Sequence, residues 1–113
     1  MILDVGEKVH IIEKRKFAED VRRHFIGEVT RCSDSSVRIQ GHAWVFDKMQ
    51  SQFTRYPEKR DRIISLEGDL IINIIPKEIN IEDIKYVRDP KMGLMVVDSK
   101  RTILIINEFG PGQ

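Results

Sequence analysis

The sequence FIGEVTRCSDSSVRIQGHAWVFD, residues 25–47, consists of two extended runs joined by a short polar turn. The turn, Ser33–Ser36, is a polar cluster of the kind that ends one strand and begins the next. The stretch also contains the only Trp and the only Cys of the chain, Trp44 and Cys32. It predicts a β-hairpin around which the other elements are arranged.

Two pairing registers suit this turn, and a slip of one residue moves every side chain to the other face. A two-residue loop at Asp34-Ser35 sets Arg31 opposite Arg38, which is unfavourable because like charges face each other. A three-residue loop gathers the apolar side chains on one face, so we expect that register. It pairs Val29 with Gly41, Gly27 with Ala43 and Phe25 with Val45. The predicted core positions are Phe25, Val29, Ile39 and Val45.

Composition bounds the protein class. The chain has 113 residues, of which 41% are hydrophobic and 33% charged, and this is typical of a folded domain rather than a disordered chain. We expect one β-rich domain over residues 1–113. The formal net charge is only +1, well short of the basic surface of a dedicated nucleic-acid binder.

The sequence also predicts a compartment. A single cysteine, Cys32, excludes an internal disulfide and suits a reducing environment. The N-terminal MILDVGEKVH lacks the basic and apolar regions of a signal peptide. The longest apolar run, around Leu70–Ile75, has the length of a strand and is too short to span a membrane. We therefore expect a soluble cytoplasmic protein without a membrane partner.

Further strands are predicted on both sides of the hairpin. Glu7–Glu13 alternates with a period of two, and Ile63–Leu66 with Leu70–Ile75 forms a second predicted hairpin around Gly68. A C-terminal meander is predicted over Lys85–Arg88, Leu94–Asp98 and Thr102–Asn107.

Connections between these strands are predicted as well. Asn80 is a predicted helix cap, which indicates a short helical turn over Ile81–Ile84. The spacing of Phe17 and Val21 allows another single turn, with an irregular connection as the alternative. Lys48–Arg62 is polar and basic and is expected to be a surface connection.

About eight short strands separated by turn signals are typical of an all-β barrel or sandwich. The predicted fold class is mainly β, as a small antiparallel barrel or strongly bent sheet, SH3-like or Sm-like in style. At most one or two short helical turns are expected.

One candidate site is a basic and aromatic strand face. The second run of the hairpin places on one face Arg38, Gln40, His42, Trp44 and Phe46. Arg55 can extend the positive charge. Bases stack on aromatic side chains at about 1–3 kcal/mol each while cations contact phosphates, so RNA or single-stranded DNA binding is one alternative. The favoured interpretation is that Trp44 packs beneath a covering segment or a partner chain.

Catalysis, metal and cofactors have weaker signals. In the expected register Glu28 lies opposite His42, where a carboxylate can orient an imidazole; a small enzyme or ligand carrier is thus a second alternative. His10, His24 and His42 lack the spacing of a metal site, so no metal is expected. No glycine-rich phosphate loop is present, and no cofactor is expected.

Two segments are apolar at successive positions, Leu70–Ile75 and Ile103–Ile106. A small domain has few ways to bury both faces of two such strands, and a two-fold homodimer is the simplest solution. The alternative is that both are central strands covered by charged connections. The leading hypothesis is therefore a non-catalytic binding or assembly module that binds itself, or another protein, through apolar strand faces.

Overall fold

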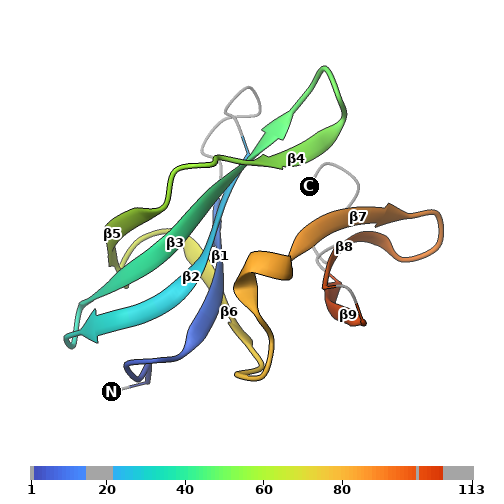
Figure 1. Cartoon of the computed structure of the whole chain (residues 1–113). Helices are drawn as coiled ribbons and strands as arrows, with labels where there is room; N and C mark the ends of the chain where they lie inside the picture. The colour runs from blue at the N-terminus through green and yellow to red at the C-terminus, as the bar shows by residue number, and fades with distance from the viewer. Residues whose placement is uncertain (1, 15–21, 99, 106–113) are drawn as a thin grey trace. The chain divides into compact units, whose positions relative to one another are not determined.

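The computed structural model describes residues 2–14, 22–98 and 100–105. These residues form antiparallel sheets with one short 3₁₀ helix, so the mainly β prediction is confirmed (Figure 1). The strands are β1 (Lys8–Glu13), β2 (Arg23–Cys32), β3 (Ser36–Asp47), β4 (Gln52–Arg55), β5 (Arg60–Ser65), β6 (Leu70–Ile75), β7 (Lys85–Asp89), β8 (Gly93–Val97) and β9 (Thr102–Ile105). The 3₁₀ helix is η1 (Ile81–Asp83).

The contacts divide the chain into two compact units, Met1–Lys77 and Glu78–Gln113. The first unit holds a six-stranded sheet and the second a three-stranded one. The expectation of a single domain over residues 1–113 stays a prediction.

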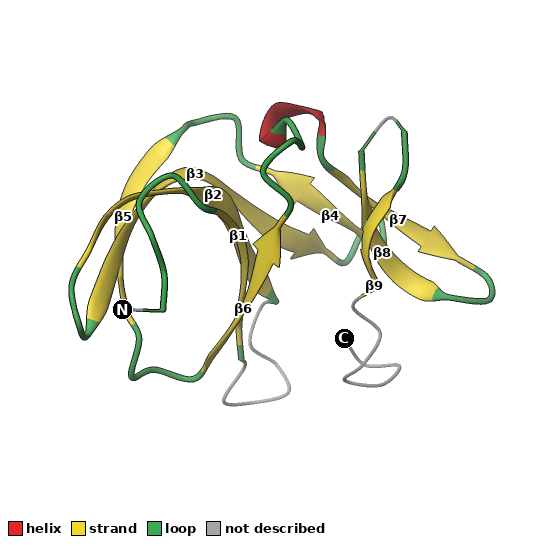
Figure 2. Cartoon of the chain, turned by 90° about the horizontal axis from the view of Figure 1, so that it is seen from below, coloured by secondary structure: helices red, strands yellow, loops and turns green. Residues whose placement is uncertain are grey.

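The first unit is a bent sheet with the order β4-β3-β2-β1-β6. Its longest strand, β3, pairs along one edge with β2, and along the other with β5 at Ser36–Gly41 and β4 at Trp44–Asp47. Figure 2 shows β5, β3, β2, β1 and β6 following one another around an arc. Among the described strands, the two ends of the sheet are not paired with each other, so the predicted barrel is open.

Two glycines allow the central strands to approach closely. Gly27 and Gly41 are directly paired between β2 and β3. A Cβ atom on Gly41 would overlap the carbonyl oxygen of Ile26, and one on Gly27 would overlap that of Gln40. Backbone atoms cannot move aside as the end of a flexible side chain can. Both positions therefore require glycine.

The hairpin register differs from the expected one. The loop is the two-residue loop Asp34-Ser35, closed by a hydrogen bond of 2.9 Å from Ser33 N to Ser36 O. Among the described residues other than glycine, only Ser51 has a positive φ, so neither loop residue needs the left-handed conformation. Beyond a bulge between Val29 and Arg31, Val29 pairs with Ile39 instead of Gly41. The expected three-residue loop is therefore wrong.

The predicted core positions are nevertheless confirmed for three of the four side chains. Phe25, Val29 and Ile39 are fully buried in one apolar cluster, whereas Val45 is half-buried and lies outside it. The remaining members of the cluster are Leu3, Val9, Ile11, Val37, Ala43 and Ile64. The opposite face of the sheet also carries buried side chains, among them Ile12, Ile26, Ile75, His10, His24 and Trp44.

The predicted hairpin around Gly68 is wrong. The turn at 66–69 does connect β5 to β6, but β5 pairs with β3 and β6 pairs with β1. The two strands thus lie at opposite edges of the sheet. Ile64 still shares a core with Leu66, Leu70 and Ile72, because the curvature brings both edges to one apolar cluster.

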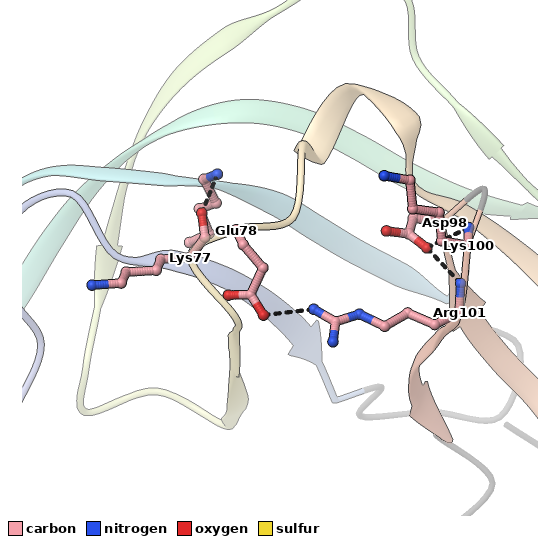
Figure 3. Close-up of polar contacts among 6 residues, drawn as sticks. Lys77, Glu78, Asp98, Lys100 and Arg101 are labelled. Atoms are coloured by element: carbon pink, nitrogen blue, oxygen red, sulfur yellow. Dashed lines mark hydrogen bonds and ion pairs between the residues drawn. The ribbon is translucent and has the colours of Figure 1, made fainter.

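The second unit matches its prediction closely. The meander β7-β8-β9 has the expected order, and Asn80 caps η1 by accepting a hydrogen bond of 3.0 Å from Glu82 N. Asp89 Oδ1 accepts from Lys91 N and Met92 N in one turn, and Asp98 Oδ1 from Lys100 N and Arg101 N in the next. Figure 3 shows the second turn, whose Arg101 also pairs with Glu78 at 2.7 Å.

The segment Lys48–Arg62 contains more regular secondary structure than expected. It contains β4, which pairs with the end of β3, and the first residues of β5. The segments QFTR and RDR are too short, and their neighbours too polar, for an alternation of apolar and polar residues to predict a strand there. The predicted turn at Phe17 and Val21 lies outside the described residues, as do Ile106 and Asn107.

Candidate functional site

The predicted strand face divides into an exposed end and a buried end. Arg38 and Gln40 on β3 are exposed, and so is Arg55 on β4. His42 and Trp44 are buried, with 9% and 7% of their surface exposed. Trp44 therefore packs inside the protein, as the favoured interpretation expects. Base stacking on its ring would require the surrounding structure to open.

Phe46, the last member of this face, belongs to an aromatic cluster. Its ring lies 5.6 Å from that of Phe53 in an edge-on arrangement, and the guanidinium carbon of Arg22 lies 4.6 Å from its centroid. Phe53 in turn contacts His24, with 4.5 Å between the ring centroids. Phe46 is half-buried. These contacts give the ring a packing role at the β3–β4 end of the sheet.

The predicted pair of Glu28 and His42 is not formed. Glu28 is exposed and lies opposite Gln40, whereas His42 lies opposite Ile26. Nδ1 of His42 lies 3.1 Å from the carbonyl oxygen of Tyr56. A carbonyl partner fixes Nδ1 as the protonated nitrogen. The arrangement holds the imidazole in place and gives Glu28 no part in orienting it.

A different set of histidines comes together in the interior. Nε2 of His10 lies 3.0 Å from Nδ1 of His24, and Nδ1 of His10 lies 3.2 Å from Nδ2 of Asn73. With the Asn73 amide as donor, His10 accepts at Nδ1 and donates from Nε2 to His24. Burial lowers the pKa of His10 to about 4. Burial, followed by the charges of His10 and Arg22, lowers the pKa of His24 to about 3.

This pair suits neutral imidazoles in a structural role. The strand alternation that placed His10 on one face could have indicated it, but only the β1–β2 pairing brings His24 beside it. In the part of the chain that the structure describes, no three His, Cys, Asp or Glu side chains gather as metal ligands.

A second cluster combines Arg38, a predicted binding residue, with Arg31, which was not predicted as one. Arg31 and Arg38 lie directly opposite each other across β2 and β3. They border an open pocket of about 150 Å³, also lined by Cys32, Ser33, Ser36 and Ile63. Its signal was present in the sequence, because the two-residue loop pairs these arginines. That repulsion was the reason for preferring the other register.

The two apolar segments lie at sheet edges rather than at sheet centres. β6 pairs only with β1, and β9 pairs only with β8, among the described strands. Ile74 on β6 and Ile105 on β9 are 50% and 46% exposed. The alternative that both are central strands is therefore wrong.

Comparison with known proteins gives no information about function. No protein-family model, curated protein or solved structure compared with the chain matches it. Within residues 2–14, 22–98 and 100–105, no helix has the length and apolar character needed to cross a membrane.

Proposed function

We propose that the protein is a non-catalytic binding or assembly module that forms a homodimer through the apolar strand β6. The observation that carries the proposal is the character of this edge strand. Its sequence is LIINII, and its outer edge has no strand partner among the described residues. Ile74 is half exposed on it.

Exposed edge strands template further pairing, and proteins usually protect them with charged residues. β5 follows this rule, since it begins with Arg60, Asp61 and Arg62. β6 carries no charge at all. Two copies of β6 can therefore meet without repulsion, and a two-fold axis would pair each strand with itself in the antiparallel sense.

The finer description of the fold belongs to the same proposal. β1, β2, β3 and β5 form an antiparallel meander, and β6 returns to pair with β1. This order supports an SH3-like architecture for the first unit. A cytoplasmic location is supported by the single half-buried thiol of Cys32, which suits a reducing compartment.

The experiment is the mass in solution as a function of protein concentration, measured by sedimentation or light scattering. We expect a dimer for the natural chain and a monomer for Ile74→Lys, because the substitution places a charge in the joined edge. Met49→Lys is the matched control, since Met49 is 97% exposed and lies outside β6. It should stay dimeric. A natural chain that is strictly monomeric at high concentration would remove the proposal.

A further inference from the structure

We propose that the pocket at the turn end of β2 and β3 binds a small phosphate-class oxyanion between Arg31 and Arg38. The pocket lies at the side of the sheet that carries β5, whereas the proposed dimer edge is β6 at the other side. The two proposals are therefore independent. Either can fail without the other.

The pairing of β2 with β3 places the two arginines next to each other. They occupy directly opposed positions just past the bulge between Val29 and Arg31. Side chains at opposed positions of an antiparallel pair begin about 4.5–5.5 Å apart at Cβ. Both residues are exposed, so both guanidinium groups can turn toward one ligand.

No described side chain neutralises the positive charges of the two arginines. Among the described residues, neither the Arg31 nor the Arg38 side chain makes an ion pair or hydrogen bond. Two like charges placed directly opposite each other destabilise the strand pair. A bound dianion between them would convert this repulsion into attraction. The fork of donors on each guanidinium also matches an oxyanion geometrically.

Hydroxyl groups complete the donor set. Ser33 Oγ and Ser36 Oγ lie 3.1 Å apart, and Ser36 N donates to Ser33 Oγ at 3.2 Å. With Ser33 donating to the carbonyl oxygen of Ser36, the Ser36 hydroxyl is able to rotate its proton toward the pocket. The turn that forces the arginines together therefore also supplies a neutral donor beside them.

Size and surrounding charge favour a compact anion over a polynucleotide. The cavity of about 150 Å³ is smaller than the several hundred Å³ of a drug-sized ligand site. The next cross-strand row is Glu28, Gln40 and Asp61, so a chain of phosphates leaving Arg38 along the strand would meet two carboxylates. Ile63, 67% exposed, offers an apolar contact at the opposite side of Arg38.

The test is a titration of the natural chain with inorganic phosphate, followed by backbone amide NMR, at an ionic strength held constant with chloride. We expect saturable shifts confined to the amides around Arg31, Ser33, Ser36 and Arg38. The double variant Arg31→Gln/Arg38→Gln should bind at least tenfold more weakly. It should still fold, because it removes a repulsion. Arg31→Lys/Arg38→Lys should lie between the two, since it keeps the charges and loses the forks.

The matched control is Arg88→Gln/Lys91→Gln, which removes two positive charges from the second unit and should bind like the natural chain. Phosphate also stabilises folded proteins by exclusion from their surface. Equal responses of the natural chain and Arg31→Gln/Arg38→Gln would therefore overturn the proposal. A phosphate monoester that competes with phosphate would extend the ligand to organic phosphates. Saturable binding of a single-stranded oligonucleotide without any phosphate response would overturn it in favour of a polyanion.

Discussion

Nε2 of His10 lies 3.0 Å from Nδ1 of His24 in the interior of the first sheet. A hydrogen bond between two imidazoles needs one donor and one acceptor, so two protonated rings cannot form it. Both groups are buried, with 0% and 4% of their surfaces exposed. The stability of the first unit should therefore depend on their remaining neutral.

We predict destabilisation in mild acid. The pKa values of about 4 for His10 and about 3 for His24 lie below the ordinary value of 6.5, so the unfolded chain binds more protons than the folded one. Stability is then complete above pH 6.5 and falls as the pH drops toward 4. The loss between pH 8 and pH 5 should be on the order of 2–4 kcal/mol. Urea unfolding across this range measures it.

His24→Gln separates this effect from general acid lability. The variant should be less stable at pH 8, because a buried hydrogen bond is disturbed. Its stability should nevertheless vary less with pH than that of the natural chain. An unchanged pH dependence would show that other groups are responsible.

Gly41 should be intolerant of any side chain. In Gly41→Ala the new methyl group would overlap the Ile26 carbonyl. We expect the free energy of unfolding to fall by about 1–3 kcal/mol, the usual range for overpacking. Gly68→Ala is the control, because a Cβ there would lie 3.7 Å from the Ser65 carbonyl oxygen, an ordinary contact. It should be neutral or slightly stabilising. Thermal and urea unfolding distinguish the two, and equal effects would contradict the close approach of β2 and β3.

Trp44 provides an intrinsic probe of the first unit. With 7% of its surface exposed, it should emit at short wavelength and resist quenching by acrylamide. Unfolding should shift the emission to the red and restore quenching. Emission that is already red-shifted and fully quenched in the native protein would show that the ring is bare, and would revive the stacking surface for single-stranded nucleic acid.

The turns of the second unit should respond to acid in a lower pH range. Hydrogen bonds from the Met92 and Lys91 amides lower the pKa of Asp89, and those from Lys100 and Arg101 lower the pKa of Asp98. The charged forms stabilise the turns above the unfolded carboxyl pKa near 3.8, and this contribution is lost as the pH falls through the folded values. Asp89→Asn keeps an acceptor oxygen, whereas Asp89→Ala does not. Faster amide exchange at Met92 in the alanine variant alone is the expected result.

The hairpin shows how much the sequence could predict. The face of the sheet on which Phe25, Val29 and Ile39 lie follows from the alternation of apolar residues, because every second side chain of a strand points to the same face. The observed pairing of Val29 differs from the expected one by two residues, and a shift of two preserves every face. The two-residue turn taken alone and the apolar pattern taken alone predict registers that differ by one residue. The bulge near Thr30 allows both the turn and the apolar pattern to be satisfied. A prediction that assumes uninterrupted pairing between the two strands could not have found this bulge.

Long-range pairing was less accessible. Leu70–Ile75 was recognisably a strand, but nothing in its alternation distinguishes β5 from β1 as the partner. The candidate anion site was missed for a related reason. In the sequence its two arginines stand out only as a repulsive pair, and a repulsive pair counts against a register when stability is the sole criterion.

The pairing of β6 with β1 also sets an order of folding. The β2–β3 hairpin closes a two-residue loop, whereas joining Lys8 to Ile75 closes nearly the whole first unit. Closing the longer loop costs more chain entropy, so we expect β6 to dock late and to detach first. A detached β6 can make with β1 of a second copy the same pairing that it makes with its own β1. The same strand therefore offers a second route to a dimer, by exchange of β6 between two chains.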